Sequence, residues 1–351
     1  MTRSGLASLF LTLVCAFPVT AKAAEWPVKG KLIGKTKDGE EKKAKDVSGI
    51  ACIEPSGFPR RCLLIDDETQ FAQIVIVKDG ELKAGEKIPL ISDKFKDKPL
   101  EFDGEGVAYA NGAFYVIGSH GHPRDPDKKL DAVKDKDQIE ASIKAVSAVI
   151  RIPLAAGDVS DDGKLSKQVK AEPSRGLREA LKAAPEILPF VDVRLEKNGL
   201  TVEGVAVKDG TLYAGLRGPV LGADQKAAIV AVPLGSLSTE ASPAKPSVLK
   251  VDLGAGRGVR DLVASEDGFV ILAGPSKDPK KTEPVKTGDY TLFRWDGAVG
   301  LDKIVDLDGR QNEDGEWIKP EAVLPLGSDM YLILSDGAKE GAPRVVSKSG
   351  G

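Results

Sequence analysis

Histidine and cysteine are scarce in this chain, and their scarcity limits the metal chemistry that it can carry. The 351 residues include only 2 histidines and 3 cysteines. A zinc site needs three or four converging histidine or cysteine ligands, so His120 and His122 with distant acids fit zinc poorly. The glycine-rich stretch GAGRGVRD (254–261) is followed by a hairpin pattern and not by a helix. It therefore predicts a turn, and no nucleotide cofactor is expected.

An excess of one charge and long apolar runs are also missing. The chain has 50 Lys and Arg against 53 Asp and Glu, and the two signs are interleaved, as in KGKLIGKTKDGEEKKAKD (29–46). No basic stripe for nucleic acid results, so no nucleic-acid partner is expected. After residue 24 no segment is long and apolar enough to span a membrane. We expect a monomer with a small molecule or a protein as its partner.

The first 23 residues have the pattern of a secretory signal peptide. Arg3 precedes an apolar run from Leu6 to Val19, and Ala21-Lys22-Ala23 forms a small-x-small cleavage site. The alternative, a retained anchor helix, is disfavoured because the run is too short to cross a bilayer. The pattern predicts cleavage of residues 1–23 and a mature chain that is periplasmic or secreted.

Export would leave one pair of cysteines, Cys52 and Cys62. An even pair in an oxidising compartment is most simply a disulfide. Pro55, Gly57 and Pro59 predict a turn between two short strands, so the cysteines can face each other across a hairpin. Two free buried thiols, or a metal pair without other soft ligands, are the alternatives.

Five segments of the chain share one pattern, which is the strongest structural signal in the sequence. Each has a polar or acidic residue, a short apolar strand, a turn rich in Gly, Asn, Asp or Ser, and a second strand. Recurrence at near-regular intervals indicates a repeat architecture. The segments are 47–68, 102–121, 202–219, 259–276 and 319–337, and their aligned polar residues are Ser48, Glu105, Glu203, Asp261 and Glu321.

Further strand candidates follow each segment, such as FAQIVIV (71–77) after the first and PFVDVRLE (189–196) after the second. Four short antiparallel strands per unit are typical of a β-propeller blade. We therefore expect an all-β fold, a single propeller of five blades over residues 24–351. Six blades and a two-sheet sandwich are the alternatives.

Two irregularities need explanation within this architecture. The fifth unit is one strand short, and the segment WPVKGKLIG (26–34) is expected to supply that outer strand and close the ring, which would remove an exposed edge. The second unit is longer than the others because it holds two charged inserts, near 124–144 and 160–187. The inserts are expected to be loops or helices and not an extra blade.

The segments EGVA (105–108), FYVIGSHG (114–121) and LIDDE (64–68) resemble a family of exported bacterial proteins known as domain of unknown function 3616. That resemblance implies a propeller and no particular chemistry. The repeated E-G-V-A strand is more loosely similar to phytase-like and lactonase-like propeller hydrolases. Those enzymes bind calcium or another divalent ion at the mouth of the central channel, so this second resemblance implies an ion-dependent hydrolase.

The propeller geometry predicts where the site lies. The aligned acids precede the inner strands, and the second strands return to the same face, so both sets should meet at one mouth of the channel. Four acids would repel one another there unless a cation compensates them. Oxygen ligands favour Ca²⁺ or another divalent cation, which makes Glu105, Glu203, Asp261 and Glu321 candidate metal ligands. A carboxylate–arginine network with Arg217 and Arg260 is the alternative.

Three more residues at this mouth are candidates for substrate chemistry. His120 could act as a general base, because an imidazole titrates near neutral pH. Arg217 and Ser119 are candidates for substrate binding, with Arg217 facing an anionic group. Two functions remain open: a divalent-ion-dependent hydrolase of the phosphoesterase or lactonase type, or a non-catalytic propeller that binds a ligand or a protein.

Overall fold

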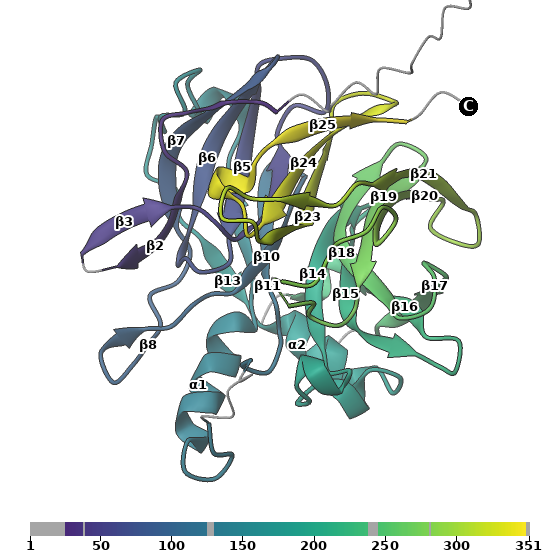
Figure 1. The fold of residues 1–351 in the computed structure, drawn as a ribbon. Coiled ribbons are helices and arrows are strands. Elements are labelled where there is room, and N and C mark those ends of the chain that lie inside the picture. The colour runs from purple at the N-terminus through teal and green to yellow at the C-terminus, as the bar shows by residue number, and fades with distance from the viewer. Residues whose placement is uncertain (1–24, 38, 125–129, 238–244, 281, 349–351) are drawn as a thin grey trace, which may run out of the picture.

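The computed structural model describes residues 25–37, 39–124, 130–237, 245–280 and 282–348. The predicted signal peptide and part of the first charged insert lie outside the described residues. Strands dominate the fold, and they are grouped into separate antiparallel sheets (Figure 1). None of the helices in the described ranges is long and apolar enough to cross a membrane.

The sheets are the blades of a five-bladed β-propeller, which confirms the predicted fold. Blade 1 comprises β4 (Val47–Cys52), β5 (Arg60–Asp66), β6 (Phe71–Lys78) and β7 (Glu81–Pro89), and blade 2 comprises β10 (Gly104–Ala110), β11 (Ala113–Gly118), β12 (Val149–Pro153) and β13 (Glu172–Ser174). Blade 3 comprises β14 (Thr201–Lys208), β15 (Thr211–Leu221), β16 (Lys226–Pro233) and β17 (Ser247–Val251). Blade 4 comprises β18 (Arg257–Ser265), β19 (Gly268–Pro275), β20 (Tyr290–Trp295) and β21 (Leu301–Leu307). Blade 5 comprises β22 (Arg310–Gln311), β23 (Trp317–Pro325), β24 (Met330–Asp336) and β25 (Arg344–Ser347).

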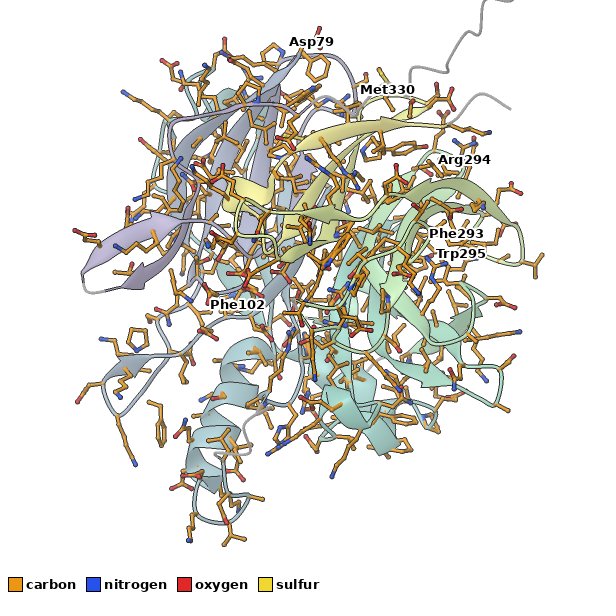
Figure 2. All side chains as sticks on the ribbon, viewed as in Figure 1. Asp79, Phe102, Phe293, Arg294, Trp295 and Met330 are labelled. Atoms are coloured by element: carbon orange, nitrogen blue, oxygen red, sulfur yellow. A yellow bond between two sulfur atoms is a disulfide. The ribbon has the colours of Figure 1, made fainter. Side chains whose placement is uncertain are left out.

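The strands β4, β10, β14, β18 and β23 are the inner strands of the five blades. Each contacts the inner strand of the next blade, and β23 contacts β4, so the ring is closed. Apolar side chains fill the spaces between neighbouring blades. Phe102, labelled in Figure 2, packs with Leu63 and Phe114 in the cluster between blades 1 and 2. The strands show near-continuous apolar runs because both faces of each blade are covered by its neighbours.

The N-terminal segment bridges blades 5 and 1, as expected, but it pairs differently. Trp26 N donates to Pro343 O at 2.8 Å beside the outer strand of blade 5. The chain then crosses to blade 1, where β1 (Val28–Lys29) pairs in parallel with β7. The fourth strand of blade 5 is β22, which pairs with the start of β23 instead of the outer edge. Hydrogen bonds of the N-terminal segment therefore connect blade 5 to blade 1, the two blades between which the ring closes.

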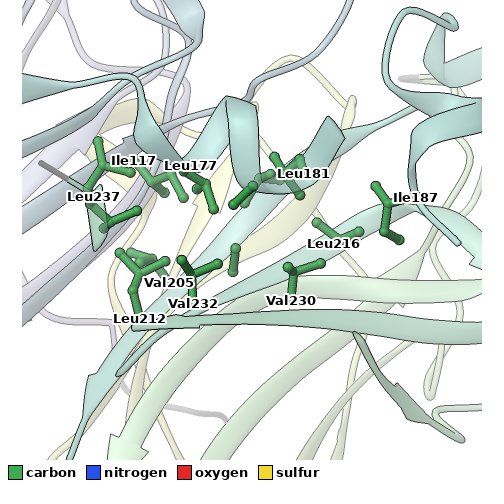
Figure 3. Packing of buried hydrophobic residues seen from close by; sticks show 14 of the residues in the cluster. Ile117, Leu177, Leu181, Ile187, Val205, Leu212, Leu216, Val230, Val232 and Leu237 are labelled. Atoms are coloured by element: carbon green, nitrogen blue, oxygen red, sulfur yellow. The ribbon is translucent and has the colours of Figure 1, made fainter. Parts of the chain in front are cut away.

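The two charged inserts of blade 2 contain the two α-helices, α1 (Lys136–Val146) and α2 (Gly176–Ala183). Both lie on the same side of the blades in Figure 1. Leu177 and Leu181 of α2 face the strands of blade 3, where they pack on Leu216 and Val230 (Figure 3). The apolar residues of the second insert are therefore part of the core, whereas its charged residues face solvent with the exception of the buried Arg178.

One predicted strand, PFVDVRLE (189–196), is wrong. Its residues form two short 3₁₀-helices, and the fourth strand of blade 2 is β13. The buried Val191 and the partly buried Phe190 of this segment pack in the same cluster as α2, so tertiary packing overrides the alternating pattern. The 3₁₀-helices of the described residues are η1 (Ala156–Asp158), η2 (Leu188–Phe190), η3 (Leu195–Lys197), η4 (Leu234–Leu237) and η5 (Lys339–Gly341). Two small hairpins lie outside the blades. One is formed by β2 (Ile33–Lys37) and β3 (Glu40–Lys43), and the other by β8 (Lys94–Phe95) and β9 (Lys98–Pro99).

The predicted disulfide between Cys52 and Cys62 is formed. The two residues are direct cross-strand partners of β4 and β5. The hairpin between them carries the expected turn. Blade 1 is thus covalently cross-linked at the end of its inner strand.

Candidate functional site

Each inner strand has a β-bulge close to its beginning, and the extra residue lies at one end of the central channel. A bulge places two residues opposite one on the partner strand and redirects a side chain. We call this end of the channel the charged mouth. The residues at the five bulges are Ser48, Glu105, Glu203, Arg260 and Glu321.

Glycine follows the bulge in the first three blades because the inner strands approach closely there. A Cβ on Gly49 would lie 2.8 Å from the Cα of Gly106. A Cβ on Gly106 would lie 2.9 Å from the carbonyl oxygen of Glu203. Both distances are too short for a side chain, so the E-G pair repeated in the sequence has a steric cause.

In blade 4 the alignment of the acids is off by one residue. The bulge lies between Val259 and Asp261, so Arg260 occupies the position that Glu203 holds in blade 3. Asp261 accepts hydrogen bonds from the backbone N of Leu262 at 2.7 Å and of Val323 at 2.8 Å, and it thereby links blade 4 to blade 5. Burial raises the pKa of Asp261 to about 8. Asp261 is an interblade contact and does not belong to the group of acids at the mouth.

Two of the predicted metal ligands, Glu203 and Glu321, are paired with arginine. Arg260 Nε lies 3.0 Å from Glu203 Oε2 and 2.7 Å from Glu321 Oε2. Arg217 Nη1 donates to Glu203 Oε1 at 2.9 Å. All four side chains are buried. This part of the mouth is the carboxylate–arginine network that the sequence offered as the alternative to a metal.

Glu105 belongs to a different group, which we call the acid cluster: Asp67, Asp103 and Glu105. Each offers a carboxylate oxygen, and these oxygens all lie within 4.8 Å of one another. The Glu105 side chain is 6% exposed, and its nearest cation, Arg124 Nη2, is 3.9 Å away. Glu105 Oε1 and Asp67 Oδ1 are buried and have no hydrogen-bond partner among the residues that the structure describes. The negative charge of this cluster is therefore poorly compensated.

The acid cluster is assembled from two blades. Asp67 directly follows β5 in blade 1, Asp103 directly precedes β10 in blade 2, and Glu105 is the bulge residue of β10. Asp103 has a positive φ of 52° and accepts a backbone hydrogen bond from Ser119 at 2.9 Å. Our alignment missed Asp103, although the stretch FDGEG (102–106) places it two residues before Glu105.

Burial and like charge both raise the pKa values of two acids of the cluster, Asp67 and Glu105. Burial raises the pKa of Asp67 well above its usual range, and the charges of Glu105 and Asp103 raise it further. Burial likewise raises the pKa of Glu105, and Glu203 and Asp103 add to the effect. The cluster must therefore hold protons or bind a cation at neutral pH.

A cavity of about 430 Å³ opens beside the acid cluster. Asp67 and Asp103 line it, together with the predicted substrate-binding residue Ser119. The Ser119 hydroxyl accepts a hydrogen bond from the backbone N of Gly121 at 3.2 Å. Other side chains around the cavity are those of Asp46, Glu68, Glu101, His122 and Arg124.

The structure does not place His120 where a general base is needed. The residue is completely buried, and neither ring nitrogen has a hydrogen-bond partner in the described ranges. Burial, together with the charges of Arg178 and Arg175, lowers the pKa of His120 to about 3. The imidazole is thus neutral at physiological pH and closed to solvent. His122, which has no assigned role in the sequence analysis, is the histidine that lines the cavity.

The donor set of the acid cluster fits a hard divalent cation. Its ligand atoms are all carboxylate oxygens, and two of them are buried without any partner. Ca²⁺ takes six to eight oxygen ligands and accepts irregular geometry, while Mg²⁺ demands a near-ideal octahedron. Three carboxylates with an adjoining polar cavity suit Ca²⁺ better, because the cavity has room for water ligands.

Comparisons with known proteins return propellers at low similarity. An exo-β-1,3-galactanase from Phanerochaete chrysosporium is 10% identical with a TM-score of 0.44, and the match covers 91% of this chain but only 63% of that one. A GH43 endo-arabinanase from Bacillus licheniformis is 8% identical with a TM-score of 0.33, covering 92% of this chain and 95% of that one. A candidate 6-phosphogluconolactonase from Bacteroides uniformis is 11% identical with a TM-score of 0.30, covering 89% and 74%.

These likenesses concern the fold and carry no argument about activity. No curated protein matches the chain. The family model described as a protein of unknown function, DUF3616, matches residues 63–314. That match spans more than half of the sequence and bears out the resemblance in EGVA, FYVIGSHG and LIDDE. The chain belongs to the DUF3616 family.

Proposed function

We propose that this protein is an exported propeller that binds a divalent cation, Ca²⁺ by preference, through Asp67, Asp103 and Glu105. One observation carries the proposal: buried carboxylate oxygens of Asp67 and Glu105 lie without hydrogen-bond partners in a cluster spanning 4.8 Å. A buried carboxylate is costly unless it is paired or coordinates a metal. Glu203 and Glu321 already have arginine partners, so they lie outside the ion site.

Export is the second part of this proposal. The disulfide between Cys52 and Cys62 supports an oxidising compartment, and residues 1–23 have the signal pattern. We expect the protein isolated from the periplasm or medium to begin near Ala24. Intact-mass analysis with and without reductant measures both features. An unprocessed N-terminus, or two alkylatable thiols in the unreduced exported protein, would contradict it.

The ion is tested by thermal melts with calcium and with a chelator. At a free concentration of 100 times the Kd, a bound ligand stabilises the native state by about 2.7 kcal/mol. The parent protein should therefore melt higher in calcium than in chelator. Glu105→Gln, which keeps the size of the side chain and removes its charge, should abolish that difference.

Glu203→Gln is the matched control, because it makes the same change at a neighbouring bulge. It removes a partner of both Arg217 and Arg260, so it should lower the melting temperature by itself. The gain in calcium should remain. A parent that ignores calcium, or a calcium response that Glu203→Gln abolishes while Glu105→Gln does not, would contradict the assignment. Native mass spectrometry gives the number of ions bound.

Hydrolysis of a phosphoester or lactone is a second candidate, favoured by the cavity that opens beside the cluster. An ion bound there would polarise an ester oxygen or activate water. In this chain, Arg124 lines the cavity and can face an anionic substrate group. Calcium-dependent turnover of p-nitrophenyl phosphate or of a δ-lactone, lost in Glu105→Gln, would support catalysis. Calcium binding without turnover would favour the non-catalytic propeller that binds a ligand or protein.

A further inference from the structure

Three cationic side chains from different parts of the ring converge on one carboxylate, that of Asp278. Lys319 Nζ lies 3.1 Å and Arg217 Nη2 lies 3.2 Å from Asp278 Oδ1. Arg124 Nη1 lies 3.6 Å from Asp278 Oδ2. Arg217 is on β15 of blade 3, Lys319 is on β23 of blade 5, and Arg124 follows β11 of blade 2. We call these three side chains the cation triad.

Two of the three cations are built into the protein, while Arg124 and the carboxylate lie nearer the surface. Arg217 is 1% exposed and Lys319 is 11% exposed, but Arg124 is 39% and Asp278 is 37% exposed. Asp278 stands three residues beyond the end of β19, in the connection to β20. The three cations hold the pKa of Asp278 well below its usual range despite partial burial.

The cation triad and the residues next to it also include buried hydrogen-bond donors that Asp278 does not engage. Within the described part of the chain, Arg217 Nε is buried and has no acceptor, and the same is true of Arg260 Nη1. The hydroxyl of Tyr290, which is almost fully buried, has no partner either. Buried donors are nearly always satisfied in proteins, so this group of donors points to a missing acceptor.

A cavity of about 720 Å³ lies on the outer side of Asp278. Asp278, Lys277 and Tyr290 line it. Its volume is in the range of small-molecule sites. The Asp278 carboxylate therefore stands between this cavity and the cation triad.

We propose that Arg124, Arg217 and Lys319 form an anion subsite, in which Asp278 is an internal stand-in for the carboxylate or phosphate of a small ligand. The incoming oxyanion displaces the Asp278 side chain and takes over its contacts. Guanidinium and ammonium groups from three directions suit a compact group with several acceptor oxygens. Arg124 lies between the two sites, 3.9 Å from Glu105 of the acid cluster and 3.6 Å from Asp278, so the subsite is tested without a cation at the acid cluster.

The experiment replaces the internal anion and measures binding of an external one. Asp278→Ala and Asp302→Ala remove the same charge, but Asp302 is an exposed residue on β21, away from the triad. Isothermal titration with inorganic phosphate, and separately with acetate, is carried out in chelator so that the ion site plays no part. We expect Asp278→Ala to bind at least one of the two anions at least ten-fold more tightly than the parent and Asp302→Ala.

A double variant ties the gain to the triad. Asp278→Ala with Lys319→Gln should lose the added affinity. If Asp278→Ala is unstable, the anion should raise its melting temperature more than that of Asp302→Ala. A gain with phosphate alone indicates a phosphate ligand, and a gain with acetate alone indicates a carboxylate. Equal affinity of Asp278→Ala and the parent for both anions, or a gain that survives Lys319→Gln, overturns the proposal.

Discussion

The two ends of the central channel are built by the same five inner strands, yet their chemistry is opposite. At the charged mouth the bulge residues are polar or ionic and take part in ion pairs or in the acid cluster. A few residues further along each strand, a cavity of about 780 Å³ has a mainly apolar lining, and we call this end the apolar mouth. The apolar side chains that the inner strands place there are Ile50, Val107, Val205, Leu262 and Leu324.

The difference teaches how one repeated strand can serve two purposes. The bulge and the close glycine contact redirect a side chain at the start of the strand, for example Glu105 before Gly106. Beyond the bulge the strand alternates regularly, and apolar side chains return to the channel. Stability at the charged mouth depends on pairing of charges, whereas at the apolar mouth it depends on burial and on one disulfide.

The largest effect is expected from Arg260→Met, which removes the cation shared by Glu203 and Glu321. A buried ion pair that loses one partner costs about 3–5 kcal/mol. Urea denaturation should show that loss in the free energy of unfolding. Arg294→Met at the apolar mouth is the control, because Arg294 is exposed on β20 beside Phe293 and Trp295 (Figure 2). It should cost less than about 0.5 kcal/mol. Equal losses in the free energy of unfolding for the two variants would contradict the difference between the charged mouth and the apolar mouth.

The next effect concerns the apolar mouth, where Cys52 lines the cavity. The disulfide closes a loop with a sequence separation of 10. Loss of such a cross-link costs about 2–4 kcal/mol. The double variant Cys52→Ser, Cys62→Ser should therefore unfold at lower urea concentration, and reductant should lower the parent to the same midpoint. Reductant that leaves the parent unchanged would show that the disulfide does not support this end of blade 1.

A smaller effect is expected from Asp261→Asn, which separates interblade contacts from ion binding. One carboxylate oxygen becomes an amide that cannot accept the backbone hydrogen bond from Leu262 or Val323. An unsatisfied buried donor costs about 1–3 kcal/mol. Thermal melts should show that Asp261→Asn has a lower melting temperature than the parent. Calcium should raise the melting temperature of both proteins by the same amount. A lost calcium response would place Asp261 among the ion ligands after all.

The smallest effect is a pH dependence at the charged mouth. Burial and a hydrogen bond with Asp336 raise the pKa of Asp46 to about 8, with Asp66, Glu68 and Lys35 also nearby. An unfolded aspartate has a pKa of about 3.9. The folded state thus keeps a proton that the unfolded state has lost, and stability should fall as pH rises through this window.

Asp46 is partly exposed, so we expect this residue to contribute only about 1 kcal/mol, or roughly 2–4 °C, between pH 5 and 8 in chelator. Asp67, Glu105 and Asp261 also have raised pKa values and act in the same direction, so Asp46→Asn should reduce the fall in melting temperature over that range without removing it. Calcium should stabilise the parent more at pH 8 than at pH 5, because carboxylates must be deprotonated to bind it. A melting temperature that rises toward pH 8 in chelator would contradict the sign.

Most of the architecture was predictable because each propeller blade produces a short-range sequence pattern. Alternating apolar residues and turn formers marked each inner hairpin, such as the one that joins β14 and β15. The disulfide was predictable because Cys52 and Cys62 are the two cysteines that remain after the predicted cleavage of the signal peptide. The segment 189–196 was predicted wrongly, since its apolar residues alternate as in a strand but Val191 is buried against the helix of the second insert.

The site was harder to predict because its geometry depends on a single extra residue per blade. Alignment by residue type selected Asp261, but the bulge gives the position at the mouth to Arg260. That one-residue difference replaces an acid by the cation that pairs with Glu203 and Glu321. His120 looked like a rim residue in the linear pattern, and only the packing around it shows that it is closed to solvent.

The sequence by itself determined the fold class, the number of blades, the disulfide and the face of the ring where polar residues gather. These follow from local periodicity, turn chemistry and cysteine count, which act over a few residues. The tertiary structure decided which charges pair and which remain uncompensated. Asp67, Asp103 and Glu105 come from blades 1 and 2, and Asp278 meets cations from blades 2, 3 and 5. Their distances are therefore set by ring closure and strand register, which no local pattern encodes.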